Sequence, residues 1–141
     1  MVVSVAEALL NSDENLGKDI RLSSDNDIVI GSQDDFGVVT YLDNAAQAIV
    51  NRFRTNVAEL TLHPLYGCRL PRMIGDPSRE NTLSLVKMHV RDALLQEPRV
   101  AEILTIRPRF EDAARQIISV EVEVTVIQSN NKLNLVYKLF L

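Results

Sequence analysis

The stretch DNAAQAIVNRFRT, residues 43 to 55, decides the fold because it carries one clear helical stripe. Four apolar residues follow the spacing i, i+3, i+4 and i+7 of a single helix face: Ala46, Ile49, Val50 and Phe53. The spacing predicts a helix over about residues 43 to 54. Asp43 and Thr40 are the candidates for its N-cap, because each side chain can accept a hydrogen bond from the first turn.

A rigid turn follows in the stretch AELTLHPLYGCRL, residues 58 to 70. Pro64 fixes its own φ angle and pushes His63 out of the helical region, while Gly67 can adopt a positive φ. We expect the aromatic ring of Tyr66 to pin this turn to the core.

A second amphipathic stretch runs from about residue 78 to 96 and is closed by Glu97-Pro98-Arg99. Pro98 ends the helix. In one interpretation of this corner, Glu97 is exposed and Arg99 pairs with a neighbouring residue. In the other, the rigid proline presents Arg99 in a fixed direction, so that its guanidinium can bind a partner carboxylate or helix-end carbonyls. The residues alone leave both open.

The segments after this corner alternate with a period of two, which predicts strands over residues 100–110, 118–127 and 133–141. A tight turn at residues 129–131 joins the last two. In the middle strand one face is apolar and the other polar, so the sheet has one wet face. The apolar set is Val120, Val122, Val124 and Val126, and the polar set is Ser119, Glu121, Glu123 and Thr125.

The N-terminal part of the sequence predicts a short helix and a small hairpin. Residues 4–10 have the composition of a short helix. Ile20 and Leu22 alternate with polar residues, residues 23–27 supply turn chemistry, and residues 28–30 return as a small hairpin. The sequence thus predicts an α+β domain. Two helices pack on the dry face of an antiparallel C-terminal sheet, and this small hairpin precedes them in the chain.

Composition supports one domain spanning residues 1–141, with 46% hydrophobic residues. No apolar run approaches the roughly 18 residues of a membrane span, and the first residues lack the basic start of a signal peptide. The single cysteine, Cys68, excludes an internal disulfide and fits a reducing cytoplasm. Residues 1–40 hold eight acids against two bases, and the remainder holds eleven against thirteen. The sequence therefore lacks the stripe of basic residues that is expected of a nucleic-acid-binding protein.

Catalytic machinery is weakly represented in the sequence. His63, Cys68 and His89 lack the spacing of a zinc site, and no glycine-rich phosphate loop is present, so we expect no metal, cofactor or catalytic residue. Asp43 with Glu59 is the least implausible glycosidase pair, and it keeps a lysozyme-like peptidoglycan hydrolase as an alternative. Asp43 is better explained as a helix cap, and Glu59 as a partner of the arginines at the end of the first helix, Arg52 or Arg54.

In this order and spacing the motifs resemble those of the GPW family of baseplate wedge proteins, which is found in contractile-tail phages, R-type pyocins and type VI secretion systems. The resemblance covers about residues 17–127, between an N-terminal extension (1–16) and a C-terminal strand (128–141). The family pattern has Gly where this chain has Ala58. The matching residues are Asp43, Asn44, Gln47, Ala48, Ile49, Arg54, Thr55, Glu59, His63, Pro64, Tyr66, Gly67, Glu97, Pro98, Arg99 and Val100.

The resemblance implies a structural subunit of the tail baseplate of a virion or injection machine, without enzymatic turnover, membrane or nucleic-acid partner. Such a subunit joins the wedge to the sheath and templates sheath assembly within a sixfold particle, and its partners are other wedge subunits and the sheath protein. A type VI secretion baseplate subunit is the alternative within the same class. In similar wedge proteins the motif formed here by Glu97, Pro98 and Arg99 contacts a helical bundle of neighbouring subunits.

The last strand adds a second candidate partner site. It ends in Leu139-Phe140-Leu141 with no further residue to shield its edge. An unpaired strand edge can accept an incoming strand. We therefore expect these three residues to lie at the surface that faces the sheath.

Overall fold

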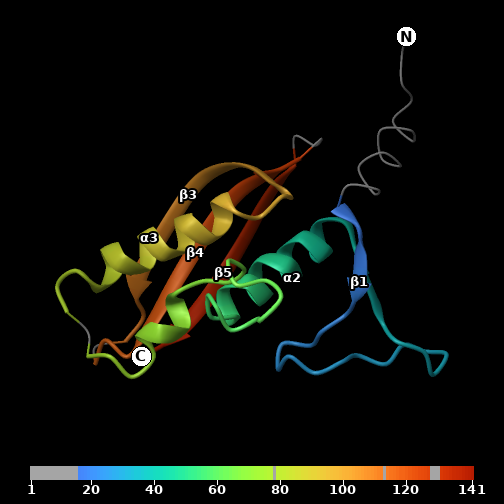
Figure 1. Cartoon of the computed structure of the whole chain (residues 1–141), viewed down its shortest axis with the longest axis horizontal. Helices are drawn as coiled ribbons and strands as arrows, with labels where there is room; N and C mark the ends of the chain where they lie inside the picture. The colour runs from blue at the N-terminus through green and yellow to red at the C-terminus, as the bar shows by residue number, and fades with distance from the viewer. Residues whose placement is uncertain (1–15, 78, 113, 128–130) are drawn as a thin grey trace, which may run out of the picture.

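The computed structural model describes residues 16–77, 79–112, 114–127 and 131–141 (Figure 1). The helix expected at residues 4–10 and most of the turn expected at 129–131 lie outside these ranges. The described elements, in chain order, are β1 (Lys18–Ile20), β2 (Val38–Thr40), α2 (Tyr41–Arg54), the short 3-10 helix η1 (Leu70–Met73), α3 (Thr82–Leu95), β3 (Val100–Phe110), β4 (Ile117–Val126) and β5 (Lys132–Phe140).

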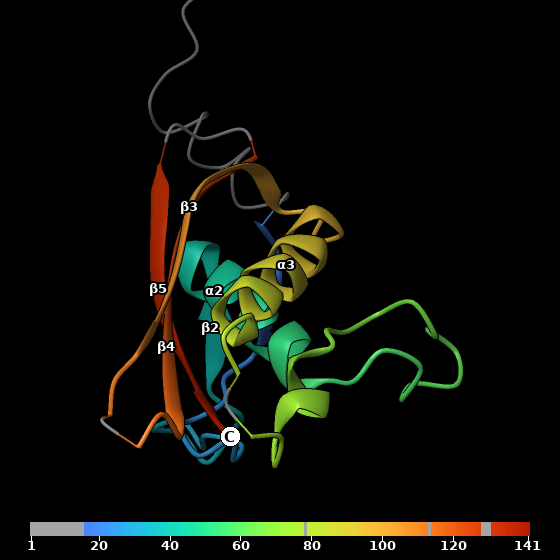
Figure 2. The same cartoon turned by 90° about the vertical axis from the view of Figure 1, so that its left-hand side faces the viewer.

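The predicted α+β architecture is confirmed. Strands β3, β4 and β5 form an antiparallel sheet in that order, and β1 pairs antiparallel with β2. Helices α2 and α3 lie on the same face of the three-stranded sheet, α3 along β3 and α2 along β5 (Figure 2). A sheet with one apolar face needs such a cover, because it cannot leave that face in water.

The core forms between the apolar face of β4 and the two helices. The predicted valine face of β4 is fully buried, and Ile49 and Phe53 of α2 and Val86 and Val90 of α3 pack in the same cluster. Ser119 was expected on the wet face but is buried. It lies on the central strand between Arg109 and Lys138, two residues with long side chains.

The helix boundaries differ from the expected ones by a few residues. Helix α2 begins at Tyr41, after Thr40 as the N-cap residue, and no side chain caps it. Asp43 therefore lies in the first turn, where a carboxylate favours the helix dipole without capping it. The buried stripe is also rotated from the expected one, because Arg52 lies on it while Val50 is only partly buried.

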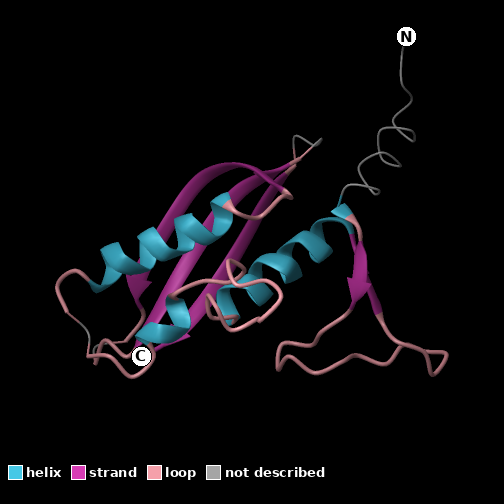
Figure 3. Ribbon diagram, in the orientation of Figure 1, coloured by secondary structure: helices cyan, strands magenta, loops and turns pink. Residues whose placement is uncertain are grey.

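The segment from residue 18 to residue 40, called the arm below, extends from the α2 side of the molecule (Figures 1 and 3). The arm contains three extended segments, which are hydrogen-bonded to one another at Arg21, Val29 and Gly37. The amide of Arg21 donates to the Gly37 carbonyl (2.8 Å), that of Val29 to the Arg21 carbonyl (3.0 Å), and that of Gly37 to the Val29 carbonyl (2.7 Å). A Cβ atom at Gly37 would stand 3.0 Å from the Val29 carbonyl oxygen, so glycine allows this close approach.

The predicted return of residues 28–30 is present as an antiparallel bridge between Leu22 and Ile28. The regular partner of β1 is nevertheless β2, from residues 38–40. Gln47 of α2 fastens the arm to the body. Its Oε1 atom accepts from the Leu22 amide at 2.9 Å, and its Nε2 atom donates to the Ile20 carbonyl at 2.8 Å.

The turn after α2 depends on two residues with positive φ. Gly67 has φ +118°, and a Cβ atom there would collide with the Thr55 carbonyl oxygen. Ala58 has φ +70°, a region that disfavours side chains, which explains the glycine of the family pattern. Glu59 does not pair with an arginine as expected, because its Oε2 atom accepts the amide of Asn56 at 2.7 Å.

Candidate functional site

The ends of α2 and α3 meet at a buried ionic cluster of Arg52, Glu97 and Arg99. Glu97 lies two residues after α3, and its Oε2 atom accepts from Nη2 (3.1 Å) and Nε (3.3 Å) of Arg52. Its Oε1 atom accepts from Nη1 of Arg99 at 2.8 Å. One carboxylate therefore holds two guanidinium groups, one from a helix 45 residues away in sequence.

Burial separates the roles of the three side chains. The side chain of Glu97 is 2% exposed and that of Arg52 is 8% exposed, whereas that of Arg99 is 31% exposed. The interpretation with a solvent-exposed Glu97 is therefore wrong, and its other half, an Arg99 paired within the chain, is present. Two cations balanced by one anion leave an excess positive charge, and Arg99 is the member of the cluster that reaches the surface.

Two further segments of the chain are attached to this cluster. The guanidinium carbon of Arg52 lies 4.4 Å from the ring centroid of Tyr66, so the turn covers the arginine by a cation–π contact. Burial raises the pKa of the Tyr66 hydroxyl, although the charge of Arg52 opposes this shift. The Leu16 carbonyl accepts from Nε of Arg99 at 3.1 Å and from Nδ2 of Asn44 at 2.7 Å.

The turn residues of the sequence motif have different environments. His63 and Pro64 are exposed, and the Pro64 carbonyl accepts the Ala58 amide at 2.9 Å. Gly67 is buried against the end of α2 and Tyr66 is half-buried over Arg52. The turn thus supports the ionic cluster from one side.

The three C-terminal residues that were predicted to bind a partner differ in their exposure to solvent. Leu139 is buried in the core and Leu141 packs against the core, so their side chains face away from solvent, whereas Phe140 is 59% exposed. Pro98 is also exposed, beside Arg99. Whether these residues contact a partner stays a prediction.

The backbone of β5 has its own free edge. The Leu141 amide donates to the Gln116 carbonyl of the β4 side (2.7 Å), and the Asn131 carbonyl accepts from Val126 (3.4 Å). Odd-numbered residues of β5 therefore bond inward to β4, and even-numbered residues direct their backbone groups outward. In the described sheet, β4 is the neighbour of β5 on one side and no strand lies on the other.

The opposite edge of the sheet is less regular. Strand β3 contains Pro108, and its register with β4 shifts between Val100 and Glu102 and again between Ile103 and Thr105. Prolines and bulges are devices that prevent strands from pairing at an edge. The pairing of β4 with β5 runs without a shift from Ile117 to Thr125.

The described part of the chain offers little for catalysis. It contains no group of three or more His, Cys, Asp and Glu side chains that could hold a metal ion. Burial raises the pKa of the Cys68 thiol, whose Sγ atom contacts the His89 carbonyl oxygen at 3.4 Å, so the reactive thiolate is disfavoured. No described helix is long and apolar enough to cross a membrane.

The geometry also separates Asp43 from Glu59. Asp43 lies in the first turn of α2, whereas the Glu59 carboxylate is bound to the Asn56 amide beyond its last turn. The eleven residue-to-residue steps of helix from 43 to 54 span about 16.5 Å at a rise of ~1.5 Å per residue. Glycosidase carboxylates stand roughly 5–9.5 Å apart. This pair does not have the spacing for glycoside hydrolysis.

Sequence reasoning missed Arg52 as a member of the cluster, and Asn44 as the residue that shares the Leu16 carbonyl with Arg99. A signal was present, because Ala45, Ile49 and Arg52 follow the spacing i, i+4 and i+7 of one helix face. An arginine on such a stripe requires a buried counter-ion. The identity of that counter-ion, Glu97, required the fold.

Comparison with known proteins gives a consistent assignment. A solved structure from Geobacter sulfurreducens, described as a candidate tail lysozyme, is similar with a TM-score of 0.62 and 27% sequence identity, over 82% of this chain and 96% of that one. No curated protein matches. The family model of the contractile injection system sheath initiator matches residues 18–129. The chain therefore belongs to the sheath initiator family of contractile injection systems.

Proposed function

We propose that this chain is a baseplate wedge subunit that starts sheath assembly by accepting a sheath strand at the outer edge of β5. Membership of the sheath initiator family gives it a structural role in sheath assembly. The observation that supports strand addition is the difference between the two edges of the sheet. The β3 edge carries Pro108 and two register shifts, whereas β5 is regular and contains no proline.

Strand addition suits a template because its affinity comes from the backbone. Each residue with outward N–H and C=O groups provides one donor and one acceptor, and from Lys132 to Phe140 every second residue does so. An incoming strand would continue the sheet without a change in side-chain packing.

A second surface, at Arg99 and Pro98, supports the contact with neighbouring wedge subunits in a sixfold baseplate. The cluster carries one positive charge in excess, and the partly exposed Arg99 is fixed by Glu97 and the Leu16 carbonyl. A fixed guanidinium suits a carboxylate or the carbonyl end of a helix. Glu97 would act through Arg99, because its own side chain is buried.

We propose that the chain has no enzymatic turnover. The separation of Asp43 from Glu59 supports this, because it leaves the pair too far apart for a glycosidase mechanism. A turbidity assay on peptidoglycan tests it with the purified chain. Clearing above the buffer control, lost on replacement of Asp43 or Glu59, would favour the hydrolase named for the similar structure.

The proposed function is tested at Val136, an exposed residue of β5 whose amide points outward. Val136→Pro removes one outward donor and leaves the inward bonds to β4, and Val136→Ala is the control that keeps the donor. We expect intact baseplates bearing tubes without sheath for the proline variant, and complete sheaths for the alanine variant, by electron microscopy. Complete sheaths on the proline variant would refute strand addition at this edge.

A further inference from the structure

The arm carries an apolar face that is separate from the outer edge of β5 and from the corner at Arg99. Three cross-strand pairs build it: Ile20 with Val38, Leu22 with Ile28, and Ile30 with Phe36. Directly opposed residues of antiparallel strands project to the same side, and so do alternate residues along a strand. The three pairs therefore share one face, while Val39, one position out of phase, is buried toward the body.

This face is open to solvent. Ile28, Ile30, Phe36 and Val38 are each more than half exposed. The arm leaves the body beside α2 and does not fold back over the sheet (Figure 1). A contiguous apolar surface of this kind is typical of a protein interaction site.

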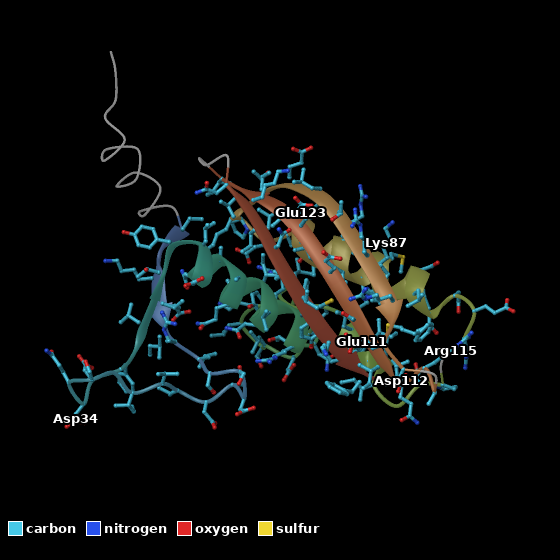
Figure 4. The ribbon with its side chains drawn as sticks, turned by 180° about the vertical axis from the view of Figure 1, so that it is seen from behind. Asp34, Lys87, Glu111, Asp112, Arg115 and Glu123 are labelled. Carbon is cyan, nitrogen blue, oxygen red and sulfur yellow. The ribbon has the colours of Figure 1, made fainter. Side chains whose placement is uncertain are left out.

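The turns at the ends of the face are acidic, whereas Asp19, which is paired with Val39, projects to the other side of the arm. Residues 18–40 contain five aspartates, against Lys18 and Arg21: Asp19, Asp25, Asp27, Asp34 and Asp35. None of them belongs to the ion pairs formed between described residues. Asp34 lies at the tip of the arm, far from the body (Figure 4). The uncompensated charge specifies a basic partner.

The arm is also held in shape before any partner binds. The three amide–carbonyl bonds among Arg21, Val29 and Gly37 tie its extended segments together, and Gln47 ties it to α2 with two more bonds. A preformed surface loses less conformational entropy on binding than a flexible one. The arm is therefore built as a docking element.

We infer that the arm docks, through this apolar face, on a different subunit of the same assembly, whose surface is apolar in the centre and rimmed by lysine and arginine. A pair of arms from two copies of this chain is disfavoured, because it would bring the two sets of aspartates together. The inference uses the family's place in sheath assembly but not strand addition at β5. It assigns the arm to attachment within the baseplate.

Photo-cross-linking in assembled particles tests the partner. With benzoylphenylalanine in place of Phe36, we expect a cross-link to a segment of another protein that contains several lysines or arginines, identified by mass spectrometry. The same substitution at Leu62, which is 87% exposed on the turn after α2, is the control for non-specific reaction. A cross-link to another copy of this chain, to an acidic segment or to no protein would overturn the inference.

Incorporation into particles tests the same surface by substitution. The double variant Ile30→Asp with Phe36→Asp should lower incorporation at least ~10-fold with an unchanged melting temperature, because both side chains are exposed. Asp25→Asn with Asp34→Asn leaves the apolar face intact and should lower incorporation less, and make it less sensitive to salt. Incorporation of both variants at the unmodified level would overturn the inference. Failure of strand addition alone would instead leave incorporation normal and remove the sheath.

Discussion

Glu97 and Arg52 form a buried ion pair, with 3.1 Å between Oε2 and Nη2, that joins the end of α2 to the end of α3. Both side chains are nearly inaccessible to water, and the second carboxylate oxygen is occupied by Arg99. Glu97 thus links the two helices inside the protein, and its other partner, Arg99, reaches the surface. The energetic role of the cluster and its partner role can be separated by substitution.

Glu97→Gln should destabilise the fold by about 3 kcal/mol, because it leaves the Arg52 guanidinium buried without a counter-ion. The control is Glu123→Gln, which removes a partly exposed pair with Lys132 and should cost less than about 1 kcal/mol. Urea unfolding of both variants measures the difference. Equal, small losses would show that the buried pair does not hold the helix ends together.

Arg99→Ala should leave the domain folded but weaken its incorporation into the baseplate. The substitution removes the bonds to Glu97 and to the Leu16 carbonyl, and charge-assisted hydrogen bonds contribute roughly 1.5–3 kcal/mol. Arg99→Lys keeps the charge without the planar fork and should be intermediate. Thermal melts and particle assembly check this prediction; normal assembly with a lowered melting temperature would make Arg99 an internal structural residue only.

Replacement of Tyr66 tests the cover over the cluster. Tyr66→Leu removes the ring over Arg52 and should cost about 1–2 kcal/mol, since the half-buried cation–π contact contributes about 1 kcal/mol. Tyr66→Phe keeps the ring and should change the free energy of unfolding little. If the phenylalanine variant lost as much stability as the leucine variant, the hydroxyl rather than the ring would be the important group.

Ala58→Gly should stabilise the protein by up to about 1 kcal/mol, because a left-handed backbone costs an L-residue roughly 1–2 kcal/mol and glycine little. The control is Ala48→Gly in the middle of α2, where φ is not positive and glycine should instead destabilise. Chemical denaturation of the two variants should shift in opposite directions. A loss of stability for Ala58→Gly would contradict the strain at this position.

His89 should make stability fall below neutral pH. Burial lowers its pKa from the ordinary value of about 6.5, and Arg69 lowers it further against the opposing effect of Asp92. The unfolded chain therefore binds a proton more readily than the folded one, so this contribution is present above pH 6.5 and is lost as the pH falls. Unfolding at pH 7.5 and pH 5.5 should show a smaller difference for His89→Gln than for the unmodified chain. An unchanged difference would exclude His89 as its source.

Much of the fold follows from sequence periodicity. The alternating valines of β4 and the apolar stripes of the two helices were predictable, because each pattern records the spacing at which one element meets the core. The rigid turn at Pro64 and Gly67 was predictable for the same local reason, since these residues restrict or extend φ. The motifs also led to the right class of machine, a contractile injection system.

The connections between these elements were decided by tertiary structure. The sequence indicated that Pro98 would end α3, but whether Glu97 faced water depended on Arg52, which packing brings to within 3.1 Å from 45 residues away. Two other features also depend on which distant segments meet. Strand β1 pairs regularly with β2 and not with residues 28–30, and the apolar face of the arm is left open. Local patterns determine the elements of this protein because they act between near neighbours, whereas burial and charge pairing act between residues that only the folded chain brings together.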